Sequence, residues 1–164
     1  MKKIFAALIV ATVAVTSLSS QPLAFEKGDK VLTFTVGVPY VSTYNPVFPP
    51  VIAGFELGIV DGILDKGAVG IGGYAGFQSF TNFSNILVGV RGCFHYTFVK
   101  NLDTYAGISI GWRIGIEEEG YTAWSGFSNG EFIGARYYFT SSFGVIAELG
   151  YGISWLTGGI AFRF

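Results

Sequence analysis

The chain has 164 residues, of which 51% are hydrophobic and only 13% are charged. Soluble domains carry about 25% charged residues, so this composition excludes an ordinary soluble protein, and the hydrophobic fraction excludes a disordered one. The formal net charge of -1 excludes a basic nucleic-acid-binding protein, and the single cysteine excludes a disulfide-stabilised fold. A membrane protein is the class that remains.

The N-terminal segment is typical of a secretory signal peptide. Two lysines precede an apolar run over residues 4–15, and small polar residues follow it. The run is too short for a membrane-spanning helix, which needs about 20 apolar residues. Cleavage after Ala24 and cleavage after Ser19 or Ser20 both agree with the pattern. The predicted organisation is a signal peptide over residues 1–24 and a single exported domain over residues 25–164.

The exported domain lacks a stretch suited to a spanning helix. The longest uncharged run, residues 31–55, contains four prolines, and glycines interrupt the other apolar stretches every few residues. Only helices and closed β-barrels satisfy all their backbone hydrogen bonds in lipid. A transmembrane β-barrel is therefore predicted by exclusion, and it requires side chains that alternate with a period of two.

That alternation is present along the exported domain. In residues 32–40, Leu32, Phe34 and Val36 alternate with threonines and a glycine. The other alternating segments are residues 51–59, 69–77, 86–98, 105–113, 133–139, 144–151 and 156–164. Each is near the ten-residue length of barrel strands. The sequence therefore predicts an all-β fold, an eight-stranded antiparallel up-and-down transmembrane β-barrel.

Charged residues inside these strands fall on the face with small and polar side chains. They are Glu56, Arg91, Arg113, Arg136, Glu148 and Arg163. An arginine that faces lipid at mid-bilayer costs about 2–4 kcal/mol, so this face is expected to line the interior, where His95 and Asp103 join the charges. We interpret the set as an internal network that neutralises buried charge, because an eight-stranded barrel is just wide enough for its own side chains. A path for selected ions is the alternative.

The connections between predicted strands alternate in length. The links after the second, fourth and sixth strands are short, and longer ones are expected over residues 41–50, 78–85 and 117–129. In outer-membrane barrels the short turns face the periplasm, so both termini are expected there.

Two segments resemble known outer-membrane barrels. Residues 156–164 resemble the C-terminal β-signal of Gram-negative outer-membrane proteins, with Ile160, Phe162 and Phe164 as its alternating apolar residues. Residues 134–152 are similar to the sixth turn and seventh strand of small OmpX-like and opacity-type barrels. The resemblance implies insertion by the barrel-assembly machinery into the bacterial outer membrane, in contact with its lipids and lipopolysaccharide. It implies no reaction, because members of this group range from anchors to adhesins to lipid enzymes.

The sequence offers little support for catalysis. His95 is the only histidine, so acid–base chemistry or Ser-His hydrolysis would have to use it, and no serine partner is identifiable. Cys93 lies on the same predicted face, but two residues do not complete a metal site. We expect no cofactor, no metal and no enzymatic activity. A lipid-modifying enzyme built around His95 is the less favoured alternative.

The predicted outer loops carry candidate recognition residues. Residues 117–119 are three consecutive glutamates, which are expected to form a solvated acidic loop, with cation bridging to lipopolysaccharide as the alternative. Aromatic residues on the same loops suggest recognition of an extracellular partner, and contact with the outer leaflet is the equal alternative. They are Tyr44, Phe48, Tyr121, Trp124 and Phe127. The sequence thus predicts a non-enzymatic barrel that mounts surface loops for envelope integrity or adhesion, with a narrow channel as the alternative.

Overall fold

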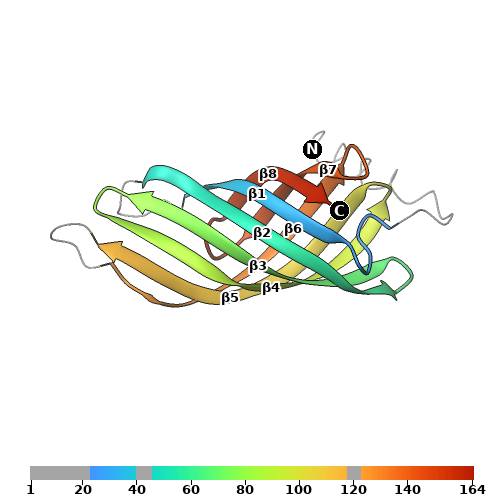
Figure 1. The fold of residues 1–164 in the computed structure, drawn as a ribbon, viewed down its shortest axis with the longest axis horizontal. Helices are drawn as coiled ribbons and strands as arrows, with labels where there is room; N and C mark the ends of the chain where they lie inside the picture. The colour runs from blue at the N-terminus through green and yellow to red at the C-terminus, as the bar shows by residue number, and fades with distance from the viewer. Residues whose placement is uncertain (1–22, 40–45, 118–122) are drawn as a thin grey trace, which may run out of the picture.

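The computed structural model describes residues 23–39, 46–117 and 123–164. Its strands form one closed antiparallel barrel, in which each strand pairs with its sequence neighbours and the first pairs with the last (Figure 1). The strands are β1 (Lys30–Val38), β2 (Pro46–Ile63), β3 (Gly67–Phe80), β4 (Phe83–Val99), β5 (Leu102–Glu117), β6 (Gly126–Tyr138), β7 (Phe143–Gly150) and β8 (Leu156–Arg163). The predicted eight-stranded up-and-down barrel is confirmed. Among the described residues, no helix is long and apolar enough to cross a membrane.

The two ends of the barrel differ in their connections. One end, which we call the turn end, carries the short β2–β3, β4–β5 and β6–β7 links together with the C-terminus and the segment before β1. Asp65 and Asn101 take positive φ angles in two of these links, a conformation that Asp and Asn accept more readily than most residues. The other end, which we call the loop end, carries the remaining connections.

Strands β2 to β6 are longer than the sequence predicts. The pairing of β1 with β2 stops at Val36 and Val51, whereas β2 continues to Pro46. The β3–β4 and β4–β5 pairings both continue to Phe83 at the loop end. These strands therefore project beyond the rim formed by β1, β7 and β8 (Figure 1). We call residues 46–50, 77–87 and 112–117 the β2–β5 extension.

Parts of all three predicted long loops belong to strands, including residues 126–129 of β6. The β3–β4 connection is a turn over residues 81–82 rather than a loop over residues 78–85, and the rings of Phe80 and Phe83 stack across it with centroids 4.8 Å apart. Residues 46–50 belong to β2 although they include three prolines. Proline has no N–H to donate, but among the described residues the pairing of β2 with β1 stops at Val51, so these prolines take no bond from that ladder.

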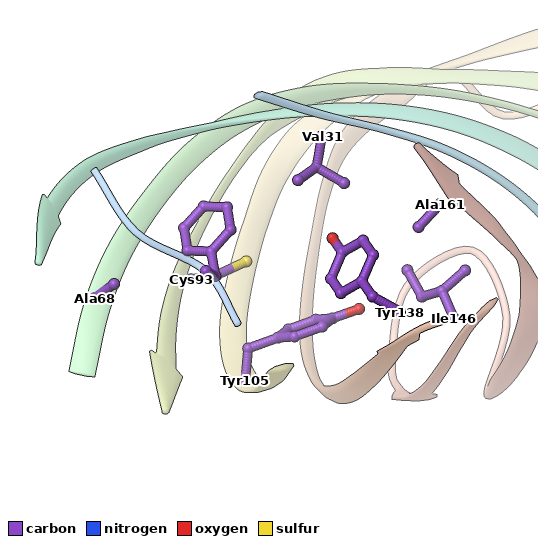
Figure 2. Packing of buried hydrophobic residues seen from close by; sticks show 8 residues of the cluster. Val31, Ala68, Cys93, Tyr105, Tyr138, Ile146 and Ala161 are labelled. Atoms are coloured by element: carbon purple, nitrogen blue, oxygen red, sulfur yellow. The ribbon is translucent and has the colours of Figure 1, made fainter. Parts of the chain in front are cut away.

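Side chains alternate between the interior and the outer surface as predicted. In β1, Val31, Thr33 and Thr35 are buried, whereas Phe34 and Val36 are about half exposed. The other strands likewise carry exposed apolar side chains on the outside. Figure 2 shows the apolar cluster inside the barrel, where Cys93, Tyr105 and Tyr138 point into a common space. The buried core therefore lies within the barrel, and the outer face offers an apolar surface suited to lipid.

Candidate functional site

A short segment before β1 enters the barrel at the turn end. Phe25 is only 1% exposed, and its ring stacks on the imidazole of His95 with 3.9 Å between the ring centroids. The N–H of Ala24 donates to Thr97 Oγ1 at 3.0 Å, and Arg163 Nη1 donates to the Ala24 carbonyl at 2.7 Å. We call residues 23–28 the N-terminal plug, because these contacts close the turn end of the interior.

Beneath the plug lies a buried group of charged side chains, which we call the interior cluster: Glu56, His95, Asp103 and Arg136. His95 Nδ1 lies 2.9 Å from Asp103 Oδ1, and its Nε2 lies 3.1 Å from Glu56 Oε1. Arg136 donates to both carboxylates, through Nη1 to Asp103 at 3.3 Å and through Nη2 to Glu56. No member is more than 2% exposed. When both ring nitrogens of His95 donate, the ring carries a positive charge. The two cations, His95 and Arg136, then face the two anions, Glu56 and Asp103. This pairing offsets part of the free-energy cost of burying charge.

Glycines on β3 allow Glu56 to reach His95. Glu56 belongs to β2 and His95 to β4, so β3 separates their backbones. The interior positions of β3 at this level are Gly70 and Gly72, which carry no side chain. A Cβ at Gly70 would lie 2.8 Å from Glu56 Oε1 and 3.1 Å from His95 Nε2. The contact between β2 and β4 therefore depends on glycine in the strand between them.

Cys93 completes a set of three groups that could hold a metal ion. Its Sγ, a ring nitrogen of His95 and a carboxylate oxygen of Glu56 all lie within 4.8 Å of one another. The sequence pattern placed all three residues on the interior face but did not indicate that Glu56 approaches the other two, because it does so only across β3. Cys93 and His95, which do not complete a metal site by themselves, thus have a third potential ligand beside them.

A second charged pair fills the interior nearer the loop end. Arg91 Nη2 lies 2.5 Å from Glu148 Oε1, and the hydroxyl of Tyr105 donates to the same oxygen at 2.7 Å. The guanidinium carbon of Arg91 also lies 4.2 Å from the centroid of the Phe132 ring. These side chains form a layer next to the interior cluster.

Beyond that layer the interior holds a cavity of about 60 Å³. Residues 151–154 of the β7–β8 connection line it, because this connection bends inward across the barrel mouth. Gln78 donates to the Ile153 carbonyl, and Ser154 Oγ donates to the Val38 carbonyl at 2.6 Å. A cavity of this size holds only a few water molecules. The β7–β8 connection therefore covers part of the loop end.

The structure separates the remaining charges of the predicted network from the interior cluster. Arg113 lies at the loop end, with its guanidinium carbon 5.8 Å from the Trp124 ring. Arg163 lies at the turn end, where it contacts Ala24 and approaches Asp29 at 3.7 Å. The interior charges thus lie at successive levels along the barrel, and Tyr105 contacts both Arg136 and Glu148.

Three of the predicted recognition residues fall within the described part of the chain, and all three lie at the loop end. Phe48 belongs to β2 and Phe127 to β6, so both are strand residues, whereas Trp124 lies in the β5–β6 connection. Their exposed fractions are 49%, 59% and 61%, respectively. Tyr44 and Tyr121 lie outside the described residues, as do the last two of the three glutamates at 117–119.

The predicted assembly residues lie at the C-terminal end of the barrel wall. Ile160 and Phe162 pair with Phe34 and Leu32 of β1, at the seam that closes the barrel. Both side chains and that of Phe164 are exposed on the outer surface. Their positions agree with an outward-facing apolar row.

Comparison with known proteins identifies the fold. No protein-family model matches the chain, and no curated protein sequence matches it. A solved structure described as "De novo design of transmembrane beta-barrels" is similar to it, with a TM-score of 0.55 and 17% sequence identity over 85% of this chain and 98% of that one. Identity at this level shows the fold alone. The chain has the fold of a transmembrane β-barrel, with eight strands.

Proposed function

We propose that the chain is a non-enzymatic protein of the bacterial outer membrane, a small barrel of the OmpX-like or opacity type. In this proposal the barrel mounts its loop end at the cell surface for envelope integrity or contact with external molecules. The observation that carries the proposal is the filled interior of the barrel. The N-terminal plug covers one end, the interior cluster lies beneath it, and residues 151–155 cover part of the other end.

The filled interior favours an anchor over a channel. An ion that crossed the barrel would have to displace Phe25 and then pass the interior cluster, whose members are at most 2% exposed. The charges of that cluster already have partners of opposite sign, so they offer little attraction to a passing ion. The one interior cavity described above, about 60 Å³, ends at the Arg91–Glu148 layer.

The position of His95 also favours a non-enzymatic role. Asp103, His95 and Cys93 have the residue types of a nucleophilic triad, but all three are buried inside the barrel. Both ring nitrogens of His95 face carboxylates, and Phe25 covers the ring. A lipid on the outer surface has no contact with these groups.

The β2–β5 extension supplies a surface for external contact. It carries Phe48 and Trp112, and Trp112 pairs with Phe127 of β6. All three are about half exposed or more, and Trp124 lies close by at 61% exposure. Aromatic side chains held on paired strands lose little conformational freedom when a partner binds, so this surface suits recognition.

Complementation of a deletion strain tests the proposal. The loop-end variant Phe48→Ser/Trp124→Ser/Phe127→Ser is compared with the control Phe98→Ser/Phe139→Ser, which changes two aromatic residues about 60% exposed at the turn end. The mobility shift of the folded barrel on unboiled gels checks that each variant folds in the membrane. We expect the loop-end variant to fold but to leave detergent resistance or surface adhesion unrestored, whereas the control restores both. Full restoration by the loop-end variant would contradict the proposal.

A further inference from the structure

Three side chains of the interior carry the atoms that zinc prefers. Cys93 Sγ, a His95 ring nitrogen and a Glu56 carboxylate oxygen lie within 4.8 Å of one another, and all three residues are buried. Thiolate, imidazole and carboxylate are the usual zinc ligands in proteins, with bond lengths of about 2.0–2.3 Å. Small rotations of these side chains would bring all three atoms onto one ion.

His95 is oriented in the manner of a metal-binding histidine. Such residues almost always give their second ring N–H to a carboxylate or carbonyl, which fixes the ring. Here Nδ1 faces Asp103 Oδ1 at 2.9 Å, and Nε2 faces Glu56 Oε1 at 3.1 Å. Glu56 is fixed in the same way, because its other oxygen accepts from Arg136. The outer partners therefore hold both ligands in place, with Nε2 and Oε1 only 3.1 Å apart.

Glycines leave room around these atoms. Cys93 pairs with Gly70 of β3 on one side and with Gly107 of β5 on the other. A Cβ at Gly70 would lie 2.8 Å from Glu56 Oε1, and a Cβ at Gly107 would lie 2.8 Å from Cys93 Sγ. The ligand atoms thus lie against positions of the barrel wall that have no side chains.

We propose that the interior of the barrel binds one zinc-class divalent ion through Glu56, Cys93 and His95, with Asp103 and Arg136 as outer partners. Coordination displaces the Cys93 thiol proton and the Nε2 proton of His95, so the ion adds no net charge to the interior. Thiolate and imidazole select zinc-class ions over magnesium and calcium, which prefer oxygen ligands. The ion ties β2 to β4 across β3, and three protein ligands leave a fourth position for water.

The position of the plug determines how the ion enters. Phe25 covers the face of His95, and no ligand residue is more than 3% exposed. The ion therefore binds while the barrel folds, before the plug docks. Metal supplied during refolding should be retained against a chelator, whereas metal supplied afterwards should bind slowly.

Cobalt(II), a spectroscopic substitute for zinc, tests the proposal. The exported chain is refolded in detergent with cobalt, and unboiled gels confirm folding. We expect one cobalt per barrel and a thiolate-to-cobalt charge-transfer band that Cys93→Ser abolishes and that His95→Gln or Glu56→Gln shifts or weakens. Asp103→Asn should lower the affinity about 10- to 100-fold, as loss of an outer partner does. Glu148→Gln, which changes an interior carboxylate outside the ligand set, should leave the band unchanged.

A second measurement needs no variant. X-ray absorption of the zinc-loaded wild-type barrel should show one sulfur ligand among nitrogen and oxygen ligands. A folded wild-type barrel that retains no metal, or a zinc shell without sulfur, would overturn the proposal. The proposal would also be overturned if folded His95→Gln and folded Glu56→Gln both gave the same cobalt band as the wild type. None of these results depends on the function of the loop end, so the two proposals can fail separately.

Discussion

The ring of Phe25 stacks on the imidazole of His95, with 3.9 Å between centroids and 23° between planes. Phe25 comes from the segment before β1, whereas His95 belongs to β4, so this contact fixes the N-terminal plug to the interior cluster. The guanidinium carbon of Arg136 lies 5.8 Å from the same ring. The plug therefore shields the cluster from solvent at the turn end.

Removing the Phe25 ring should destabilise the barrel. Phe25→Ala empties a site that is 1% exposed, and such changes in packed cores cost about 3–5 kcal/mol. Phe25→Leu keeps most of the volume and should cost less. Urea unfolding in detergent, followed by the mobility shift, measures the free energy of unfolding. Equal stability of Phe25→Ala and wild type would show that the plug does not stay docked.

The buried ion pairs should show strong coupling. Arg136→Met leaves the carboxylates of Glu56 and Asp103 without their cation, and breaking a buried pair costs about 3–5 kcal/mol. Adding Glu56→Gln to Arg136→Met removes one unpaired anion, so the double variant should be more stable than the sum of the single changes indicates. A double-mutant cycle by urea unfolding measures this coupling, and additive losses would contradict it.

Two glycine substitutions make a matched test of the space on β3 and β4. Gly70→Ala introduces a Cβ 2.8 Å from Glu56 Oε1, so it should displace that carboxylate and destabilise the barrel. Gly92→Ala points into open space with no atom within 4 Å, so it should have little effect on stability. Unfolding midpoints of the two variants give the comparison. A larger loss for Gly92→Ala than for Gly70→Ala would contradict the described contact.

The contacts of Ala24 bear on the predicted signal cleavage. Its N–H donates to Thr97 and its carbonyl accepts from Arg163, so removal of Ala24 would take partners from both residues. We therefore expect the exported protein to begin after Ser19 or Ser20. The intact mass of the protein purified from membranes measures this directly, and a chain that begins at Phe25 would contradict the expectation.

The sequence was sufficient to predict the barrel wall but not its full height. Alternation along β1, β4 and β8 reports which side chains face lipid, because one face of each strand must be apolar. The β2 part of the β2–β5 extension escaped the prediction because the prolines at 46, 49 and 50 indicate a loop. They lie beyond the point where the described pairing of β2 with β1 stops, and strand ends are not visible in an alternating pattern.

The interior cluster was predictable in part. The alternation of side chains placed Glu56, His95 and Arg136 on the inside. Their contacts with one another, however, depend on the closing of the barrel and on glycine at position 70. Phe25 gave no signal, because it precedes the first alternating segment and its packing arises only when the segment folds back into the barrel.

The N-terminal plug and the interior side chains fill the barrel, so we expect that its interior does not conduct. Single-channel recording in a planar bilayer, with the refolded protein checked for folding by its gel mobility, tests this most directly. We predict no discrete conductance steps for the wild type at any of several salt concentrations, because the N-terminal plug and residues 151–155 obstruct both ends. Regular, reproducible steps from the folded wild-type barrel would contradict the account.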